Sequence, residues 1–288
     1  MENSRRNVLK KMLAGTALFS ALPFLDIKAK NKMGLKGNIN HSVCQWTFGH
    51  LSLEDLCVTV KALGFNAIDL VGPSGWETLK KHDIQSSMCN GAEINLIHGF
   101  NHKDYHSTLV KNYTEMIPMV AKAGYKNLIC FSGNKEGMDD ETGLQNSEKG
   151  LKKILGLAEK HGVILQMELL NSKVDHPDYM ADNSKWGVEL CKRLDSDNFK
   201  LLYDIYHMQI DEGDVIRTIK QNFQYYGHYH TAGNPGRNEI DQSQELNYPA
   251  IMKAIYDTGY TGYVAQEFIP KASDKVASLR EAIEICDV

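Results

Sequence analysis

The chain has 288 residues and a formal net charge of −4, with 42% hydrophobic and 24% charged residues. This length suits one large domain or two small ones, and the composition is that of a soluble globular protein able to bury a sizeable core. A slightly acidic chain lacks the basic footprint of a general nucleic-acid binder, so we expect no nucleic-acid partner.

The N-terminus is predicted to be an export signal. Paired arginines stand in Ser4–Lys10, and a mild apolar run follows from Met12 to Leu25. The run is too short and too weakly apolar to span a bilayer, so we expect no stable membrane span. The pattern resembles the twin-arginine bacterial signal, although a basic disordered start is the alternative. We therefore expect residues 1–36 to be a twin-arginine signal and linker, and the protein to be periplasmic.

From about residue 40, short apolar runs alternate with amphipathic helical patterns. The predicted strands cover residues 42–46, 67–71, 86–92, 127–132, 163–168, 201–204, 226–230 and 263–267. The first helical pattern has Ser52 as its cap and Gly64 as its end. Eight strand-then-helix units predict an α/β fold, a (β/α)8 barrel over residues 37–288. An open doubly wound sheet is the alternative, but no Gly-x-Gly-x-x-Gly follows the first strand.

Six cysteines are spread along the chain without any Cys-x-x-Cys pair. Cys44 and Cys130 lie in apolar, strand-like stretches. We predict that the cysteines are buried small hydrophobic residues and not a disulfide framework.

Four ionisable side chains close successive predicted strands. They are Glu168, Asp204, His230 and Glu267. Such groups are costly in apolar surroundings unless they are paired or bind a metal. In a barrel the carboxyl ends of the strands converge on one mouth, so the four would meet there. Each one alone is more often a cap, a salt-bridge partner or a core histidine, but the shared position predicts one site.

These four residue types favour metal-assisted proton transfer. Three carboxylates and one imidazole favour a single divalent ion, Mn²⁺ or Mg²⁺ ahead of Co²⁺ or Zn²⁺. Such an ion can bind adjacent oxygens of a sugar-like substrate and polarise a carbonyl. Glu168 and Glu267 could then act as the catalytic pair, removing and returning a proton through an enediolate.

Two flanking residues are candidates for substrate binding. His207 follows Asp204 by three residues and could donate to substrate or ligate the metal, or simply start a helix. Arg237 ends a turn-rich loop, where it could bind a carboxylate, hydroxyl or phosphate, or lie solvated at the surface. Three aromatic residues could wall the pocket or pack in the core: Trp46, Trp76 and Phe100.

Several segments occur together here: Glu168–Asn171, Leu202–Gln209, Gly227–Arg237, Glu245–Tyr248 and Gln266–Glu267. They resemble the hydroxypyruvate isomerase group of the xylose isomerase-like barrel superfamily, over about residues 40 to 285. The resemblance implies a TIM barrel and an aldose–ketose type isomerase, nominally interconverting hydroxypyruvate and tartronate semialdehyde. It also implies a metal held by Glu168, Asp204, His230 and Glu267. The two glutamates would be the acid/base pair, and His207 and Arg237 would bind substrate oxygens.

Three features depart from that group. Hydroxypyruvate isomerases usually carry Gln where His230 stands, and a His there is more similar to ketose 3-epimerases. The segment Gly99–His106 looks shorter than in that group, and an export signal is unusual for an enzyme of cytosolic metabolism. The alternative function is therefore a ketose 3-epimerase, or a periplasmic enzyme acting on 3-keto sugars or glycosides with the same metal site.

Two further alternatives belong to other classes. Abasic-site nucleases of the superfamily share the Asp204-x-x-His207 spacing, but they need histidines on the second and third strands, where this chain offers Asp69 and Ser87–Cys89. A non-catalytic sugar-binding protein would not need two acid/base groups. We expect a small sugar-like or hydroxy-keto acid as substrate, and we leave a homo-oligomer open because barrels of this superfamily are often dimers or tetramers.

Overall fold

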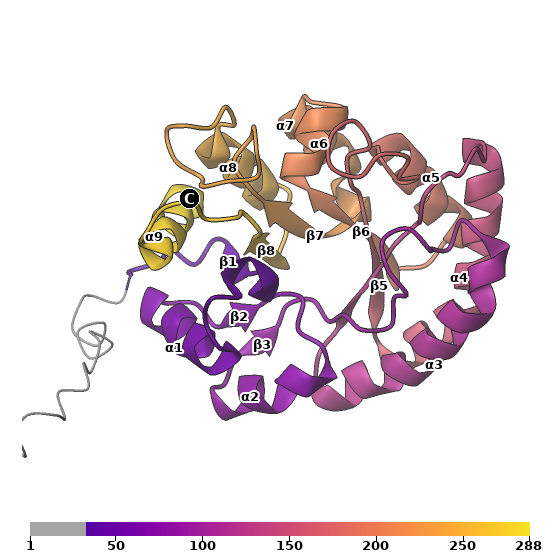
Figure 1. The fold of residues 1–288 in the computed structure, drawn as a ribbon, viewed down its shortest axis with the longest axis horizontal. Coiled ribbons are helices and arrows are strands. Elements are labelled where there is room, and N and C mark those ends of the chain that lie inside the picture. Colours follow the sequence, from indigo (N-terminus) through magenta and orange to yellow (C-terminus); the bar gives the residue numbers. More distant parts are fainter. Residues whose placement is uncertain (1–32) are drawn as a thin grey trace, which may run out of the picture.

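A computed structural model describes residues 33–288 of the chain. Residues 1–32, which hold most of the predicted export signal, lie outside the described part. Figure 1 shows the strands around a common centre with the helices outside them. The predicted α/β barrel is confirmed.

The strands are β1 (Asn40–Val43), β2 (Ala67–Ile68), β3 (Gln85–Ser86), β4 (Asn127–Cys130), β5 (Ile164–Glu168), β6 (Phe199–Asp204), β7 (Tyr226–Thr231) and β8 (Tyr263–Gln266). The helices are α1 (Leu53–Leu63), α2 (Trp76–Lys81), α3 (His106–Ala123), α4 (Asp140–His161), α5 (Ser184–Leu194), α6 (Ile205–Asp211), α7 (Val215–Asn222), α8 (Tyr248–Asp257) and α9 (Lys275–Cys286).

The strands close into a ring through two kinds of pairing. Six of them form one parallel sheet in the order β1-β8-β7-β6-β5-β4, and β2 pairs with β3. Single parallel bridges join the two sheets, Cys44 with Asp69 and Cys89 with Leu128. The amide of Asp69 donates to the Val43 carbonyl at 2.8 Å, and that of Cys89 to the Asn127 carbonyl at 2.9 Å. All carboxyl ends of the strands therefore face one mouth.

The first three strands are shorter than the sequence patterns predict. Residues 45–48 form a 3₁₀ turn where the first strand was expected to continue. Leu70 has a left-handed backbone with φ 56°, and Gly91 has φ 108°, so neither stretch stays extended over its predicted length. The hydrophobic pattern predicts which residues are buried. It does not predict where the backbone leaves the sheet, and here this happens before the buried run ends.

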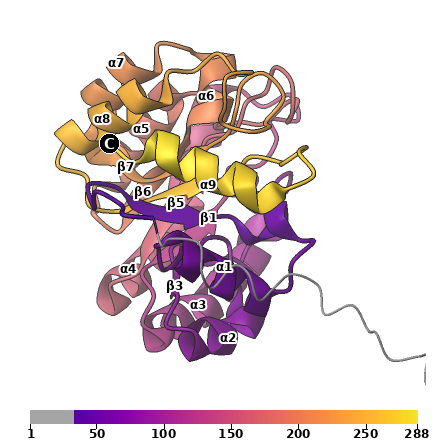
Figure 2. The same ribbon diagram turned by 90° about the vertical axis from the view of Figure 1, so that its left-hand side faces the viewer.

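Helix boundaries agree with the predicted signals. The Ser52 side chain accepts a hydrogen bond from the Asp55 amide at the start of α1. Gly64 ends the helix in the left-handed conformation with φ 99°, which a residue with a Cβ rarely adopts. Figure 2 shows α9 beside β1, where the Lys36 amide donates to the Asp287 carboxylate at 2.8 Å.

Buried apolar side chains fill the barrel wall and the layer under the helices. All six cysteines are buried and free, as predicted. Phe100 and Trp76 are in this core. Within residues 33–288, every helix is too short or too polar to cross a bilayer.

Candidate active site

The structure brings the four predicted side chains together at the carboxyl ends of neighbouring strands. Glu168 is the last residue of β5, Asp204 the last of β6, His230 lies in β7, and Glu267 follows β8. Each is at most 5% exposed. One oxygen or nitrogen atom from each lies within 4.8 Å of the others, a spacing suited to one shared ion.

His230 lies at the centre of this group. Its Nδ1 atom is 3.0 Å from Glu168 Oε1 and 2.9 Å from Glu267 Oε2. The same atom is 3.9 Å from Asp204 Oδ2. The imidazole therefore presents one nitrogen to all three carboxylates.

Asp204 has one oxygen committed and one free. Its Oδ1 accepts a hydrogen bond from the His207 amide at 2.9 Å and caps helix α6. Its Oδ2 is buried without a hydrogen-bond partner among the described residues. A buried carboxylate oxygen is costly unless it is compensated. An Arg237 amino group lies 3.9 Å from Oδ2, and a directly bound cation would compensate this oxygen further. The donor set and this free oxygen both fit a divalent ion.

Glu267 is fixed from three sides. Trp46 Nε1 donates to Glu267 Oε1 at 2.8 Å, and an Arg237 amino group donates to Oε2 at 2.6 Å. The third contact is His230. The Arg237 guanidinium carbon lies 5.2 Å from the centre of the Trp46 ring and 5.7 Å from that of Tyr206. Trp46, which is 47% exposed, is thus a wall of the site, unlike the other two candidate aromatic residues.

The loop after β7 delivers Arg237 to the mouth. Gly233 donates its amide to the Asn238 carbonyl at 2.8 Å, and the Ile269 amide donates to the Arg237 carbonyl at 2.7 Å. A Cβ on Gly233 would stand 2.2 Å from the Glu239 carbonyl oxygen, so only glycine permits this close approach. Arg237 therefore lies over the site and not in solvent.

His207 is fully buried, and its hydrogen bonds assign its tautomer. Asn171 Nδ2 lies 2.6 Å from His207 Nδ1 and 2.7 Å from Asp175 Oδ2, so the amide donates to both. The proton of the neutral ring is then on Nε2. That atom has no hydrogen-bond partner among the described residues and lies 3.8 Å from Asp204 Oδ2. It is free to donate to a substrate oxygen.

Burial and neighbouring charges separate the pKa values of these groups. Burial raises the pKa of Glu168, and the charge of Glu267 raises it further. Burial also raises the pKa of Asp204 to about 8, although Arg237 opposes the shift. Burial would raise the pKa of Glu267 as well, but Arg237 and His230 hold it well below its usual range. The two glutamates therefore differ in proton affinity, as an acid/base pair requires.

Asp69 and His228 also belong to this site, although the pattern of ionisable strand ends did not predict them. Asp69 Oδ1 is 3.1 Å from His230 Nε2, and its Oδ2 is 2.8 Å from His228 Nε2. The His-x-His spacing of 228 and 230 places both rings on one face of β7, a signal present in the sequence. Asp69 and Ser87 occupy the places after β2 and β3 where the nuclease alternative needs histidines.

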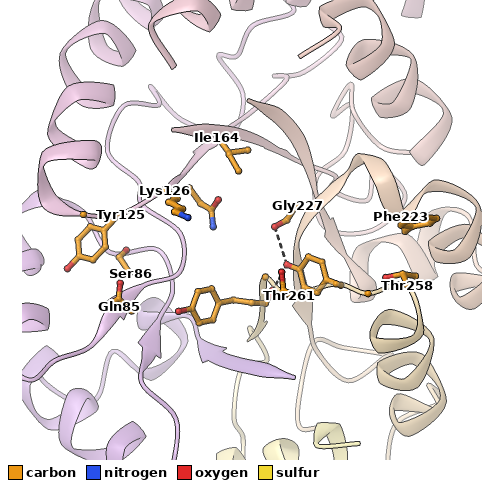
Figure 3. A pocket seen from close by; sticks show the side chains of 15 residues that line it. Gln85, Ser86, Tyr125, Lys126, Ile164, Phe223, Gly227, Thr258 and Thr261 are labelled. Carbon is orange, nitrogen blue, oxygen red and sulfur yellow. Dashed lines mark hydrogen bonds between the residues drawn. The ribbon is translucent and has the colours of Figure 1, made fainter. Parts of the chain in front are cut away.

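A cavity lies at the amino-terminal end of the barrel, opposite the mouth that holds the clustered side chains (Figure 3). Its volume is about 640 Å³, and Lys126 is the one charged residue among those lining it. Tyr260 donates its hydroxyl to the Gly227 carbonyl at 3.1 Å there. None of the predicted site residues lines this cavity.

Two curated relatives cover part of the chain. It is 36% identical over 115 residues to the 2-oxo-tetronate isomerase of Cupriavidus necator, covering 40% of this chain and 44% of that protein. It is 30% identical over 158 residues to the hydroxypyruvate isomerase of Escherichia coli K12, covering 54% and 60%. These matches span about half the length of each relative.

The wider comparisons concern the fold. The crystal structure of a 3-keto-D-glucoside 4-epimerase from E. coli has a TM-score of 0.73 at 18% identity, covering 85% of this chain and 98% of that one. Residues 59–287 match the family described as Xylose isomerase-like TIM barrel. The chain therefore belongs to the xylose isomerase-like TIM barrel family.

Proposed function

We propose that this protein is a metal-dependent isomerase that moves a proton between adjacent carbons of a small hydroxy-keto substrate. The nominal pair is hydroxypyruvate and tartronate semialdehyde. The observation that carries the proposal is the pair of buried glutamates whose oxygens lie 3.0 and 2.9 Å from one nitrogen of His230, beside a buried carboxylate oxygen of Asp204 that has no hydrogen-bond partner among the described residues.

Glu168 and Glu267 perform the proton transfer. One carboxylate takes a proton from the substrate carbon that bears a hydroxyl, and the other gives a proton to the neighbouring carbonyl carbon. The hydroxyl proton passes to the former carbonyl oxygen, so that the hydroxyl and carbonyl groups exchange places. Glu168 ends β5 and Glu267 follows β8, and β6 and β7 lie between these two strands in the sheet. The opposite directions of their pKa shifts support unequal roles.

One divalent ion would be held by Glu168, Asp204, His230 and Glu267. When bound, it supplies positive charge that polarises a substrate carbonyl. Mn²⁺ and Mg²⁺ suit a set made mostly of oxygen donors, and Co²⁺ or Zn²⁺ are the next choices. The carboxylates then have two tasks, holding the ion and orienting toward the substrate carbons.

His207 and Arg237 bind the substrate oxygens. Since His207 Nε2 is buried and without a hydrogen-bond partner among residues 33–288, a substrate hydroxyl or carbonyl oxygen would satisfy it. The guanidinium of Arg237, directed inward by its loop, suits a carboxylate group. The names of the two curated relatives support a substrate of this kind, a small oxo acid.

The test is a turnover assay on hydroxypyruvate with each metal, followed by proton NMR in D₂O. We expect metal-dependent formation of tartronate semialdehyde, with deuterium from solvent entering the carbon that receives the proton. Absence of both interconversion and exchange with every metal would overturn the proposal.

A second candidate function keeps the site and changes the substrate. His230 stands where the resembling isomerases usually carry Gln, and this favours a ketose 3-epimerase or an enzyme of 3-keto sugars and glycosides. The fold shared with the 3-keto-D-glucoside 4-epimerase is compatible with it. Screening ketoses and 3-keto-glycosides with the same metals separates the two candidates, since a preference for hydroxypyruvate over all of them excludes this one.

We also propose that residues 1–36 direct export to the periplasm. The paired Arg5 and Arg6 support this, although residues 1–32 lie outside the described structure. Cell fractionation of the full chain should place it in the periplasm, and Arg5→Lys with Arg6→Lys should retain it in the cytoplasm. An equal distribution of both forms would refute the signal.

A further inference from the structure

Asp69 is a fully buried carboxylate that belongs to the opposite side of the barrel from the four clustered side chains. It follows β2, which is neighbour to β1 and β3, yet its Oδ1 reaches 3.1 Å from Nε2 of His230 in β7. A carboxylate with 0% exposure is costly unless its oxygens are compensated. Neighbouring groups must therefore compensate the two oxygens of Asp69 inside the barrel.

Both oxygens of Asp69 have polar neighbours: Oδ1 faces His230, and Oδ2 has two further contacts. Ser87 donates its hydroxyl to Oδ2 at 2.7 Å, and His228 Nε2 lies 2.8 Å from the same atom. The Ser87 hydroxyl also lies 2.6 Å from that of Ser42. The loops and strands that carry these groups hold the carboxylate in one orientation, with Oδ1 directed at His230.

His230 has a choice of tautomer that matters for its proposed role. Its Nδ1 faces carboxylate oxygens of Glu168 and Glu267 at 3.0 and 2.9 Å, and these would favour a proton on that nitrogen. A protonated nitrogen cannot ligate a metal. A carboxylate on the other side of the ring gives the Nε2 proton an acceptor, so Nδ1 can keep its lone pair.

We propose that Asp69 is a positioning residue that holds the Nε2 proton of His230 and so directs the Nδ1 lone pair toward Glu168, Asp204 and Glu267. The inference rests on the proposed metal site. Ser87 and His228 contact Asp69 in turn, so a ligand on β7 is supported by Asp69 and Ser87, which follow β2 and β3, and by His228 of β7 itself.

A rival role for Asp69 is direct ligation. Asp69, His228 and His230 also offer ligand atoms within 4.8 Å of one another. In that arrangement a second ion would lie between them and His230 would face one ion with each nitrogen. The number of ions bound per chain distinguishes the two roles.

The experiment compares Asp69→Asn with Ser87→Ala in the otherwise intact protein. Mn²⁺ affinity is measured without substrate by competition with a fluorescent chelator, and bound metal is counted by elemental analysis. Asn keeps the shape of the side chain but can turn its amide donor toward His230. Ser87→Ala removes one hydrogen bond to Asp69, and the bond to Ser42, but leaves the carboxylate. We expect one ion per wild-type chain, a loss of about 10- to 100-fold in affinity for Asp69→Asn, and a clearly smaller loss for Ser87→Ala.

A second measurement reads the tautomer directly in the wild-type protein. Nitrogen-15 NMR of the Mg²⁺-loaded wild-type protein, with His230 assigned by comparison with His230→Gln, should show the proton on Nε2. A proton on Nδ1, an unchanged affinity in Asp69→Asn, or two ions per wild-type chain would each overturn the inference. A wild-type chain that binds no ion would instead refute the proposed function, and the inference with it.

Discussion

The two halves of the barrel contribute to its mouth in different ways. Strands β5 to β8 carry the four clustered side chains, Glu168, Asp204, His230 and Glu267. In the half from β1 to β4, Asp69 and Trp46 contact this cluster directly. Ser87 contacts Asp69, and Ser42 contacts Ser87. The β5–β8 half therefore carries the three carboxylates and the imidazole, and the β1–β4 half holds two of these groups in place by hydrogen bonds.

A third region, the cavity at the amino-terminal end, sharpens this contrast. It is roomy but lined mainly by uncharged side chains and backbone (Figure 3). Its volume of about 640 Å³ would admit a ligand, yet it lacks the buried ionisable groups that perform chemistry. Five predictions rank these regions by expected effect.

The largest effect is expected for Glu267→Gln and, separately, Glu168→Gln in the β5–β8 half. Gln cannot accept or return a proton, so kcat should fall by about 10²- to 10⁴-fold for each. Steady-state kinetics on the accepted substrate measures this. Glu245→Gln is the matched control at an exposed glutamate and should leave kcat unchanged. Activity near the wild-type level in either site variant would contradict the proposed acid/base pair.

Asp204→Asn should weaken metal binding by at least about 100-fold, beyond the loss typical of an outer-shell residue. Asn can still cap α6 through its carbonyl oxygen, so the melting temperature of the metal-free protein should change little. Isothermal titration calorimetry and thermal unfolding measure the two effects. The same substitution at Asp139, which caps α4, is the control and should not alter metal affinity. A lower melting temperature with unchanged metal affinity would contradict our assignment of Asp204 as a metal ligand.

Arg237→Lys should lower kcat/KM by about 10- to 100-fold, the range expected for losing hydrogen bonds to a charged group. Lys keeps the charge but not the planar fork that binds a carboxylate. Kinetics with the accepted substrate measures this. Arg193→Lys, which alters surface ion pairs with Glu141 and Glu189, is the control. Equal kcat/KM in the two variants would remove Arg237 from the substrate site.

Trp46→Phe tests the rim contributed by the other half. It removes the hydrogen bond from Nε1 to Glu267 Oε1, which at about 1 kcal/mol corresponds to a fall of roughly fivefold in kcat/KM. Trp76→Phe removes a comparable bond to the Val71 carbonyl in the core and should lower the melting temperature instead. If both variants lose only stability, Trp46 is a structural residue.

Lys126→Ala, at the amino-terminal cavity, should have the smallest effect. Because this lysine lies at the far end of the barrel from the clustered carboxylates, kcat/KM should stay within about twofold of wild type. The same assay measures it. A large loss would show that the amino-terminal cavity takes part in the reaction and would break the distinction between the two ends.

Local patterns in the sequence were enough to predict the barrel and the neighbourhood of Glu168, Asp204, His230 and Glu267. Residues at the carboxyl ends of successive strands lie side by side around the mouth of a barrel. The position of each residue along its strand is therefore sufficient to predict that they meet. Ser52 and Gly64 predicted the bounds of α1, because helix capping depends only on a few adjacent residues.

Tertiary structure alone decided which residues reach across the ring. Asp69 contacts His230 from 161 positions away, and Trp46 contacts Glu267 from 221 positions away. No local period links such pairs, because their distance depends on how the barrel closes. The short early strands were also not predicted, since the left-handed backbone at Leu70 and Gly91 occurs inside the predicted strands. Local sequence patterns therefore predict the four strand-end groups at the mouth. The contacts that orient them, from Asp69 to His230 and from Trp46 to Glu267, depend on how the barrel closes.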